Sequence, residues 1–180
     1  MAQLKRFHPN DNIKPFDCGD ADLNGFLLEE NSSVSNARHH ANELLAVTYV
    51  IEDDDKTIAY FSLLNDKIDR EIADKNEWKK ITKNIPFLMR RRSHPAVKLG
   101  RLAVSLDYQH QGWGPNILNA LKHWFTNNNK TGCRFITVDA LVEKVGFYAK
   151  YGFNILVTPK EGDETVLMYY DLKKFVETRK

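Results

Sequence analysis

Apolar and polar residues follow one another in blocks along the chain, and the blocks predict strands first. Residues 44–52 and 57–64 are two apolar runs, rich in β-branched and aromatic side chains, on either side of the polar stretch 53–56. Such residues are enriched in strands, and a short polar break between two runs of this kind favours a hairpin. The aspartates of the break have no further ligands at metal-loop spacing, so we expect a solvated turn and no metal site.

The second half of the chain alternates strand-like and helix-like runs. Residues 97–105 and 135–140 predict strands, and residues 117–125 predict a helix between them. The helix prediction rests on apolar residues at helical spacing, namely Ile117, Leu118, Leu121, Trp124 and Phe125. The strand–helix–strand order predicts that the two strands pair in parallel. Further strands are predicted at 153–157 and 166–172, after a short helix.

The remaining segments give a less regular pattern. A short strand at 3–8 is followed by a helix that Asp20 or Asp22 can cap. Residues 32–41 are polar and predict the end of a helix and a loop. Residues 66–85 are charged with few large apolar side chains, which predicts a loosely attached helix or a variable insertion.

Length and composition are those of an ordinary globular protein. With 180 residues, 42% hydrophobic and 28% charged, the chain predicts one domain around one core. No apolar run approaches the roughly 18 residues of a membrane helix, and the first residues lack the apolar stretch of a signal peptide. Cys18 and Cys133 are too few for a disulfide framework or a zinc site. We therefore expect a cytoplasmic protein without membrane contact or bound metal.

Charge is distributed unevenly, although the net charge is only +2. Residues 75–101 contain nine basic side chains and one acid, Glu77. Such a segment is either a solvated basic loop or a surface that meets an anionic partner, and the sequence leaves both interpretations open.

The segment 109–116, with the sequence QHQGWGPN, is the first candidate for chemistry. It lies between a predicted strand and a predicted helix, so several backbone N–H groups and the positive end of a helix dipole can converge on a phosphate. Gly112 and Gly114 allow close backbone approach, and Pro115 fits the first position of a helix. The spacing matches neither a P-loop nor a dinucleotide-binding fingerprint. An ordinary strand–helix connection remains the alternative.

Three stretches of the chain carry a family resemblance. Arg101-Leu102-Ala103-Val104 with Gln109-x-x-Gly112-x-Gly114 is similar to motif A of the GNAT superfamily of acyl-CoA-dependent N-acetyltransferases. In that motif a strand runs beside the pantetheine arm and the turn holds the CoA pyrophosphate. F-Y-x-x-x-G-F at 147–153 resembles GNAT motif B. F-D-C-G-x-x-x-L-N-x-F-L at 16–27 resembles the first helix of a subgroup that includes acetyltransferase toxins of bacterial toxin–antitoxin pairs.

The resemblance implies a fold as well as a family. The expected fold is α/β (α+β), a single GNAT-like domain over residues 1–180. Its sheet would be mixed and largely antiparallel, twisted, with six or seven strands flanked by helices and a splayed parallel strand pair at the acyl-CoA site. Residues 66–95 would form a variable segment on the acceptor side.

The resemblance also implies the residues of the site. Acetyl-CoA would contact Leu102, Ala103, Val104, Gln109, His110, Gln111, Gly112, Trp113, Gly114, Asn116 and Tyr148. The acceptor side would include Arg90, Arg91, Arg92 and Arg101. Two positions depart from the family pattern: Pro115 removes one N–H donor from the pyrophosphate site, and Leu141 replaces an asparagine often found before motif B. Both departures bear on the affinity for CoA.

The implied chemistry is direct acetyl transfer to a primary amine, which depends mainly on positioning. The Val104 N–H would stabilise the oxyanion, and Tyr148 would act as general acid toward the CoA thiolate. Tyr151 lies three residues further on and ranks second for the acid. No residue stands out as a base, with His94 as the one candidate, so deprotonation of the amine through water is compatible with the sequence.

Three functions remain open at this point. The first is an N-acetyltransferase, in the EC 2.3.1 class, that uses acetyl-CoA as donor and a primary amine as acceptor. The second is a toxin-type acetyltransferase that acts on aminoacyl-tRNA and has an antitoxin partner. The third is a non-catalytic acyl-CoA-binding module, against which Tyr148 and the phosphate-type turn argue. We expect a homodimer in each case.

Overall fold

A computed structural model describes residues 1–30, 35–127 and 129–178. Its strands form a seven-stranded mixed sheet, as the family resemblance led us to expect. The strand order is β1 (Gln3–Arg6), β2 (Val47–Glu52), β3 (Thr57–Asp69), β4 (Ser93–Val104), β5 (Phe135–Leu141), β7 (Thr165–Asp171) and β6 (Asn154–Ile155). The chain forms two compact units. The first comprises residues 1–64 and 99–117, and the second comprises residues 65–98 and 118–180. Within the described ranges, none of the helices combines the length and apolar character that crossing a lipid bilayer requires.

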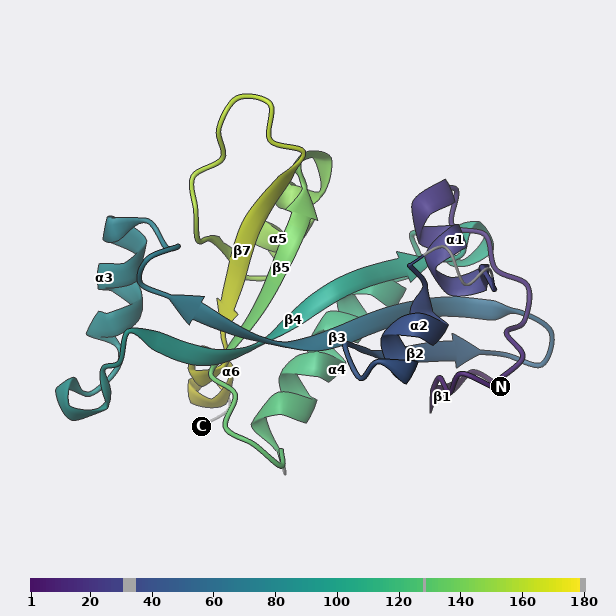
Figure 1. The fold of residues 1–180 in the computed structure, drawn as a ribbon, viewed down its shortest axis with the longest axis horizontal. Coiled ribbons are helices and arrows are strands. Elements are labelled where there is room, and N and C mark those ends of the chain that lie inside the picture. The colour runs from purple at the N-terminus through teal and green to yellow at the C-terminus, as the bar shows by residue number, and fades with distance from the viewer. Residues whose placement is uncertain (31–34, 128, 179–180) are drawn as a thin grey trace. The chain divides into compact units, whose positions relative to one another are not determined.

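The first unit contains the predicted hairpin. Strand β2 (Val47–Glu52) pairs antiparallel with β3 (Thr57–Asp69), and β1 (Gln3–Arg6) pairs with the other edge of β2 (Figure 1). Helix α1 (Ala21–Leu28) is capped by Asp20, whose carboxylate accepts a 3.0 Å hydrogen bond from the Leu23 N–H. Of the two predicted caps, Asp20 is therefore the one used.

A second short helix in this unit replaces part of a predicted loop. Helix α2 (Ala37–Asn42) begins after Asn36, whose side chain accepts from the His39 N–H at 3.0 Å. The prediction of a helix end at residues 32–34 lies outside the described residues. The core of the unit contains aromatic and aliphatic side chains from both helices, from the strands and from the segment between β1 and α1: Phe7, Phe16, Phe26, Leu27, Ala37, Val50, Tyr60 and Ala103.

The second unit is built on a parallel strand pair, as the strand–helix–strand order predicted. Strand β4 (Ser93–Val104) pairs in parallel with β5 (Phe135–Leu141) through Ala96 to Lys98. Strand β7 (Thr165–Asp171) pairs antiparallel with β5 over its whole length, and Figure 1 shows the two side by side. The strand predicted at 153–157 is shorter, because β6 covers only Asn154–Ile155.

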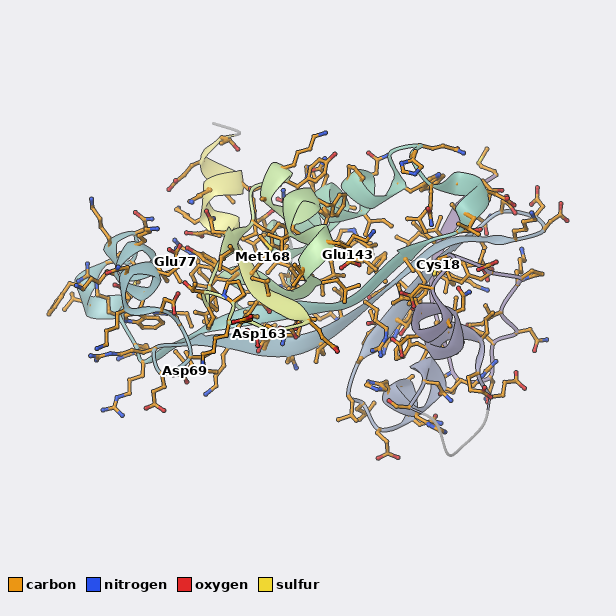
Figure 2. The ribbon with its side chains drawn as sticks, turned by 90° about the horizontal axis from the view of Figure 1, so that it is seen from above. Cys18, Asp69, Glu77, Glu143, Asp163 and Met168 are labelled. Atoms are coloured by element: carbon orange, nitrogen blue, oxygen red, sulfur yellow. The ribbon has the colours of Figure 1, made fainter. Side chains whose placement is uncertain are left out.

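Segment 66–85 is better anchored than its composition predicts. Strand β3 continues to Asp69, and α3 (Lys75–Lys83) follows. Ile68 and Ile81 are buried in a core that also contains Ala73, Ile85, Ala96, Phe135, Leu156 and Tyr169. Glu77 of α3, labelled in Figure 2, accepts a 2.6 Å hydrogen bond from the Tyr169 hydroxyl. A few apolar side chains at the right spacing are enough to fix the segment.

Three further helical segments complete this unit. Helix α5 (Val145–Lys150) follows a 3-10 turn, η3 (Val142–Lys144), and lies beside β5. Helix α6 (Leu172–Glu177) follows β7 directly. Met168 of β7, labelled in Figure 2, is 1% exposed, so this strand passes through the core of the unit.

Candidate active site

Motif A forms the end of β4 and the turn that follows it, within the first unit. After Val104 the Ser105 N–H donates to the Ile58 carbonyl, and the Leu106 N–H donates to the Asp17 carbonyl, each at 2.8 Å. A short 3-10 helix, η2 (Leu106–Tyr108), leads into the glycine-containing segment. Both β3 and the loop before α1 therefore hold the start of the turn.

The side chain of Gln109 holds the same turn through hydrogen bonds to backbone carbonyls. Its side-chain Nε2 donates to the carbonyls of Cys18 and Val104, each at 3.0 Å. Cys18, labelled in Figure 2, belongs to the loop before α1, where its own N–H donates to Asn24 Oδ1 at 2.9 Å. Gln109 was predicted to contact acetyl-CoA. In the structure the side-chain nitrogen already donates to these two carbonyls of the protein. A contact between acetyl-CoA and the other polar groups of Gln109 stays a prediction.

Backbone conformation explains the residue types in the turn. His110 and Gly112 both lie in the left-handed region, with φ of 61° and 85°. A Cβ at Gly112 would meet nothing closer than Asn116 Nδ2 at 3.9 Å, so glycine is favoured here by its φ and not by crowding. The Gln111 side chain donates to the Asp107 carbonyl at 2.8 Å. This hydrogen bond joins the turn to the 3-10 helix that precedes it.

The helix after the turn begins earlier than predicted. Helix α4 covers Trp113–Thr126, so Pro115 is its third residue and not its first. Proline is still tolerated there, because first-turn N–H groups have no acceptor within the helix. The Asn116 N–H donates to the Gly112 carbonyl at 3.0 Å and is therefore not available to a phosphate. The donors that remain for an anion are the N–H groups of Gln111, Gly112, Trp113 and Gly114.

Two carboxylates near the turn are engaged by neighbours. Asp107 forms an ion pair with Lys56 at 2.5 Å, and Asp53 accepts a 2.5 Å hydrogen bond from the Tyr108 hydroxyl. The Tyr108 bond is the largest of several contacts that lower the pKa of Asp53 to about 2. The predicted solvated turn at 53–56 is thus tied to the motif A segment.

Arg101, predicted to lie on the acceptor side, is held by α1 of the same unit. Its guanidinium lies 4.0 Å from the centre of the Phe26 ring and 3.7 Å from Asp22. The Arg101 Nε atom is buried and has no hydrogen-bond partner among the described residues. Any acceptor contact by this residue would therefore use only part of the guanidinium.

The other three predicted acceptor-side residues belong to the second unit. Arg90, Arg91 and Arg92 are exposed, although the Arg90 Nε donates to the Ile85 carbonyl at 3.1 Å. They follow a 3-10 helix, η1 (Phe87–Met89), whose Phe87 and Leu88 are 78% and 88% exposed. An exposed aromatic ring beside exposed guanidinium groups has the chemistry that single-stranded nucleic acid prefers.

Motif B forms α5, also in the second unit. Tyr148 is buried, and its ring packs against Phe147 at 5.1 Å and Phe153 at 5.4 Å. Burial raises the pKa of Tyr148 to about 12, so the hydroxyl is fully protonated at neutral pH. Tyr151 packs against Phe147 at 5.2 Å and is only half-buried.

His94 is placed in the core of the second unit. Its ring stacks on Trp78 at 5.5 Å and lies 6.4 Å from Phe135. Burial, helped by the charge of Arg134, lowers the pKa of His94, and Nε2 has no partner among the described residues. A side chain in this position contributes to packing, and a role as general base finds no support here.

Lys122 is a residue that sequence reasoning missed. It lies on α4, is 5% exposed, and donates from Nζ to the Tyr151 carbonyl at 2.9 Å. The signal was available, because Lys122 stands four residues after Leu118 and three before Phe125, on the predicted apolar face. A lysine on such a face must find a partner inside the protein.

The sequence of residues 77–174 matches a family described as Acetyltransferase (GNAT) domain. The match covers more than half of the chain. The protein therefore belongs to the GNAT acetyltransferases, an EC 2.3.1 class of enzymes, and the family predicted from the motifs is confirmed. A search among curated proteins found no match.

Solved structures of KacT and of the toxin AtaT have the same fold. A Tyr-to-Phe mutant of KacT is 25% identical with a TM-score of 0.73, over 98% of each chain. AtaT complexed with acetyl-methionyl-tRNAfMet is 23% identical with a TM-score of 0.75, over 100% of each chain. A mutant AtaT toxin bound to the C-terminus of the antitoxin AtaR and acetyl-CoA is 22% identical, with a TM-score of 0.69, over 99% of this chain and 98% of that one.

Proposed function

We propose that this enzyme transfers the acetyl group of acetyl-CoA to the α-amine of an aminoacyl-tRNA. The observation that carries the proposal is the full-length likeness to AtaT, solved with acetyl-methionyl-tRNAfMet. A toxin role with an antitoxin partner follows the same likeness, since AtaT is described as a toxin bound to the antitoxin AtaR. The reaction would take place in the cytoplasm, where charged tRNA is found, and we retain a homodimer as part of the proposal.

The proposed donor site uses backbone groups of motif A. The N–H groups of Gln111, Gly112, Trp113 and Gly114 would bind the pyrophosphate of acetyl-CoA, at the positive end of α4. Leu102, Ala103 and Val104 would run beside the pantetheine arm, and His110 would flank the phosphates. The Val104 N–H would stabilise the oxyanion that forms when the amine attacks the thioester carbonyl.

Tyr148 completes the proposed reaction as the general acid. The amine nitrogen bonds to the carbonyl carbon, the carbon–sulfur bond breaks, and the amine loses a proton to water. Tyr148 then gives its proton to the departing CoA thiolate and regains one from solvent. Because the pKa of Tyr148 is raised by burial to about 12, the proton is present at every pH at which the enzyme would work.

The lack of an assigned base favours an α-amine as the acceptor. At pH 7 an α-amine with a pKa of about 7.7–8.0 is neutral in about one molecule in ten, whereas a lysine amine is neutral in about one in 2,500. An α-amino acceptor can therefore attack without a protein base. Arg90, Arg91 and Arg92 supply the exposed positive charge that a polyanionic acceptor needs.

Labelled acetyl-CoA with defined acceptors tests the proposal. The protein is incubated with charged tRNA, with the same tRNA after deacylation, and with polyamines, peptides and aminoglycosides. We expect label only on charged tRNA, released as an N-acetyl amino acid when the ester is hydrolysed, and at least tenfold less with Tyr148→Phe. Label on small amines and none on tRNA would reject the acceptor, and equal rates for both proteins would reject Tyr148 as the acid.

A further inference from the structure

Lys122 is a charged side chain inside the second unit. It is 5% exposed, its Nζ donates to the Tyr151 carbonyl at 2.9 Å, and the same nitrogen lies 4.0 Å from the centre of the Tyr170 ring. Burial lowers the pKa of Lys122. An ammonium group in such a place is costly unless hydrogen bonds and π-electrons replace water, and these two contacts provide both.

The carbonyl that Lys122 contacts is the C-terminal cap of α5. That helix has only six residues, Val145–Lys150, and carries Tyr148 in its last turn. The Tyr148 carbonyl accepts N–H groups from both Tyr151 and Phe153, at 3.0 and 3.1 Å. A helix this short has little stability of its own, and a cation at its carboxyl end favours it through the helix dipole.

Aromatic packing connects Lys122 to Tyr148 by a second route. The Tyr170 ring lies under the Lys122 ammonium, and a Cβ at Gly152 would come within 3.0 Å of the same ring. Phe153 packs against Tyr170 at 5.6 Å and against Tyr148 at 5.4 Å. Lys122 and Gly152 thus confine the Tyr170 ring on two sides. Because Phe153 packs against both rings, the position of Tyr170 affects the position of Tyr148.

We propose that Lys122 is the positioning residue for the general acid. Its ammonium holds the end of α5 and the Tyr170–Phe153 pair, and through them it sets the place of the Tyr148 hydroxyl. The inference rests on the proposed function, because it assumes that Tyr148 is the acid. A displacement of about 1 Å at a reacting group can cost about a hundredfold in rate, so a residue that touches no substrate can still control turnover.

A double-mutant cycle separates positioning from general stability. Lys122→Met keeps a long unbranched side chain and removes the charge and the donor, and Lys150→Met, at an exposed position of α5, is the control. We expect Lys122→Met to lower kcat about ten- to a hundredfold, with the KM for acetyl-CoA changed less than twofold. In a Tyr148→Phe background the same substitution should change kcat less than twofold, because its effect passes through the missing hydroxyl. Lys150→Met should resemble the unmodified enzyme.

Two results would overturn the inference, and they are distinguishable. If Tyr148→Phe lowers kcat but Lys122→Met lowers it equally in both backgrounds, or not at all, Lys122 is only structural. If Tyr148→Phe leaves kcat unchanged, the proposed acid and the inference fail together.

Should Lys122→Met not fold, Lys122→Gln keeps a donor for the Tyr151 carbonyl without the charge and enters the same cycle. A 19F resonance from 3-fluorotyrosine at position 148 should shift with Lys122→Gln and not with Lys150→Met.

Discussion

The Tyr108 hydroxyl donates a 2.5 Å hydrogen bond to the Asp53 carboxylate, joining the turn between β2 and β3 to the segment that leads into the phosphate-type turn. The bond is the leading reason for the low pKa of Asp53, about 2. Since the pKa is lower in the folded protein, the stabilisation is present above the unfolded value of about 3.9 and is lost as the pH falls through 2.

Tyr108→Phe should therefore raise the pKa of Asp53 toward its ordinary range and move acid unfolding to a higher pH. NMR titration of the Asp53 side-chain carbon measures the first effect, and a circular dichroism titration measures the second. Because Tyr108 stands directly before Gln109, the KM for acetyl-CoA should also rise a few-fold. An unchanged Asp53 titration would show that the hydrogen bond is not made in solution.

Substitutions at Gln109 test whether this residue braces the turn. Gln109→Glu has the same shape but brings a carboxylate, which only accepts hydrogen bonds, against the carbonyls of Cys18 and Val104. We expect it to lower the free energy of unfolding by about 1–3 kcal/mol, and by more than Gln109→Met does. Urea denaturation measures the difference. If both variants keep full stability and change only the KM for acetyl-CoA, Gln109 serves the ligand and not the turn.

Gly112→Ala tests the left-handed backbone of the turn. With φ at 85° and open space around the missing Cβ, alanine should cost about 1–2 kcal/mol of conformational strain and no steric clash. Gly25→Ala, in α1, is the matched control, because a Cβ there meets nothing within 4 Å and one at Gly112 meets only Asn116 Nδ2, at 3.9 Å. Replacing a helical glycine should stabilise the protein by about 0.4–1 kcal/mol. Equal effects at both positions in urea denaturation would contradict the assignment.

Neutralising the three exposed arginines tests the acceptor side. Replacing Arg90, Arg91 and Arg92 by glutamine should lower kcat/KM for charged tRNA and leave the KM for acetyl-CoA unchanged. The slope of log kcat/KM against log salt should become shallower by about one for each arginine that contacts a phosphate. Lys160→Gln, at another exposed position of the same unit, is the control. An identical salt slope for the triple variant would exclude these arginines from tRNA binding.

The raised pKa of Tyr148 predicts how activity and stability depend on pH. With a pKa of about 12, no alkaline loss of activity below pH 10 should come from its ionisation. Since the folded value exceeds the ordinary value of about 10, the associated stability is complete below pH 10 and is lost as the pH rises through 12. Pre-steady-state rates between pH 7 and 10 measure the first effect. A fall with a midpoint near 9 that Tyr148→Phe abolishes would contradict it.

Local sequence pattern was sufficient for much of the fold. The β2–β3 hairpin followed from two β-branched runs around a polar break, and the parallel pairing of β4 with β5 followed from the helix between them. The start of α4 was misplaced because apolar periodicity begins only at Ile117, whereas the first turn is made of Trp113, Gly114 and Pro115. First turns carry capping and backbone signals, which periodicity does not detect.

The sequence located the segments of the candidate site but not the contacts that hold them in place. Motif A and motif B located the turn and Tyr148. Cys18, one of the two residues whose carbonyls accept from Gln109, lies 91 residues away in the chain. Spacing along the sequence carries no information about such a bond. The anchoring of α3 was underestimated for a related reason, because Ile68 and Ile81 depend on core residues of β4, β5 and β7.

The contact between Lys122 and Tyr170 can form only late in translation, because Tyr170 lies close to the C-terminal end of the chain. Tyr148 is synthesised before β7 (Thr165–Asp171), which contains Tyr170. A nascent chain that ends before β7 therefore contains the proposed acid but lacks the ring that helps to position it. A six-residue helix without its packing partners stays largely unfolded in water. Ribosome-bound fragments that end before β7 would therefore be inactive under the proposed mechanism. Acetylation of charged tRNA, the proposed reaction, would begin only after the last strand has emerged.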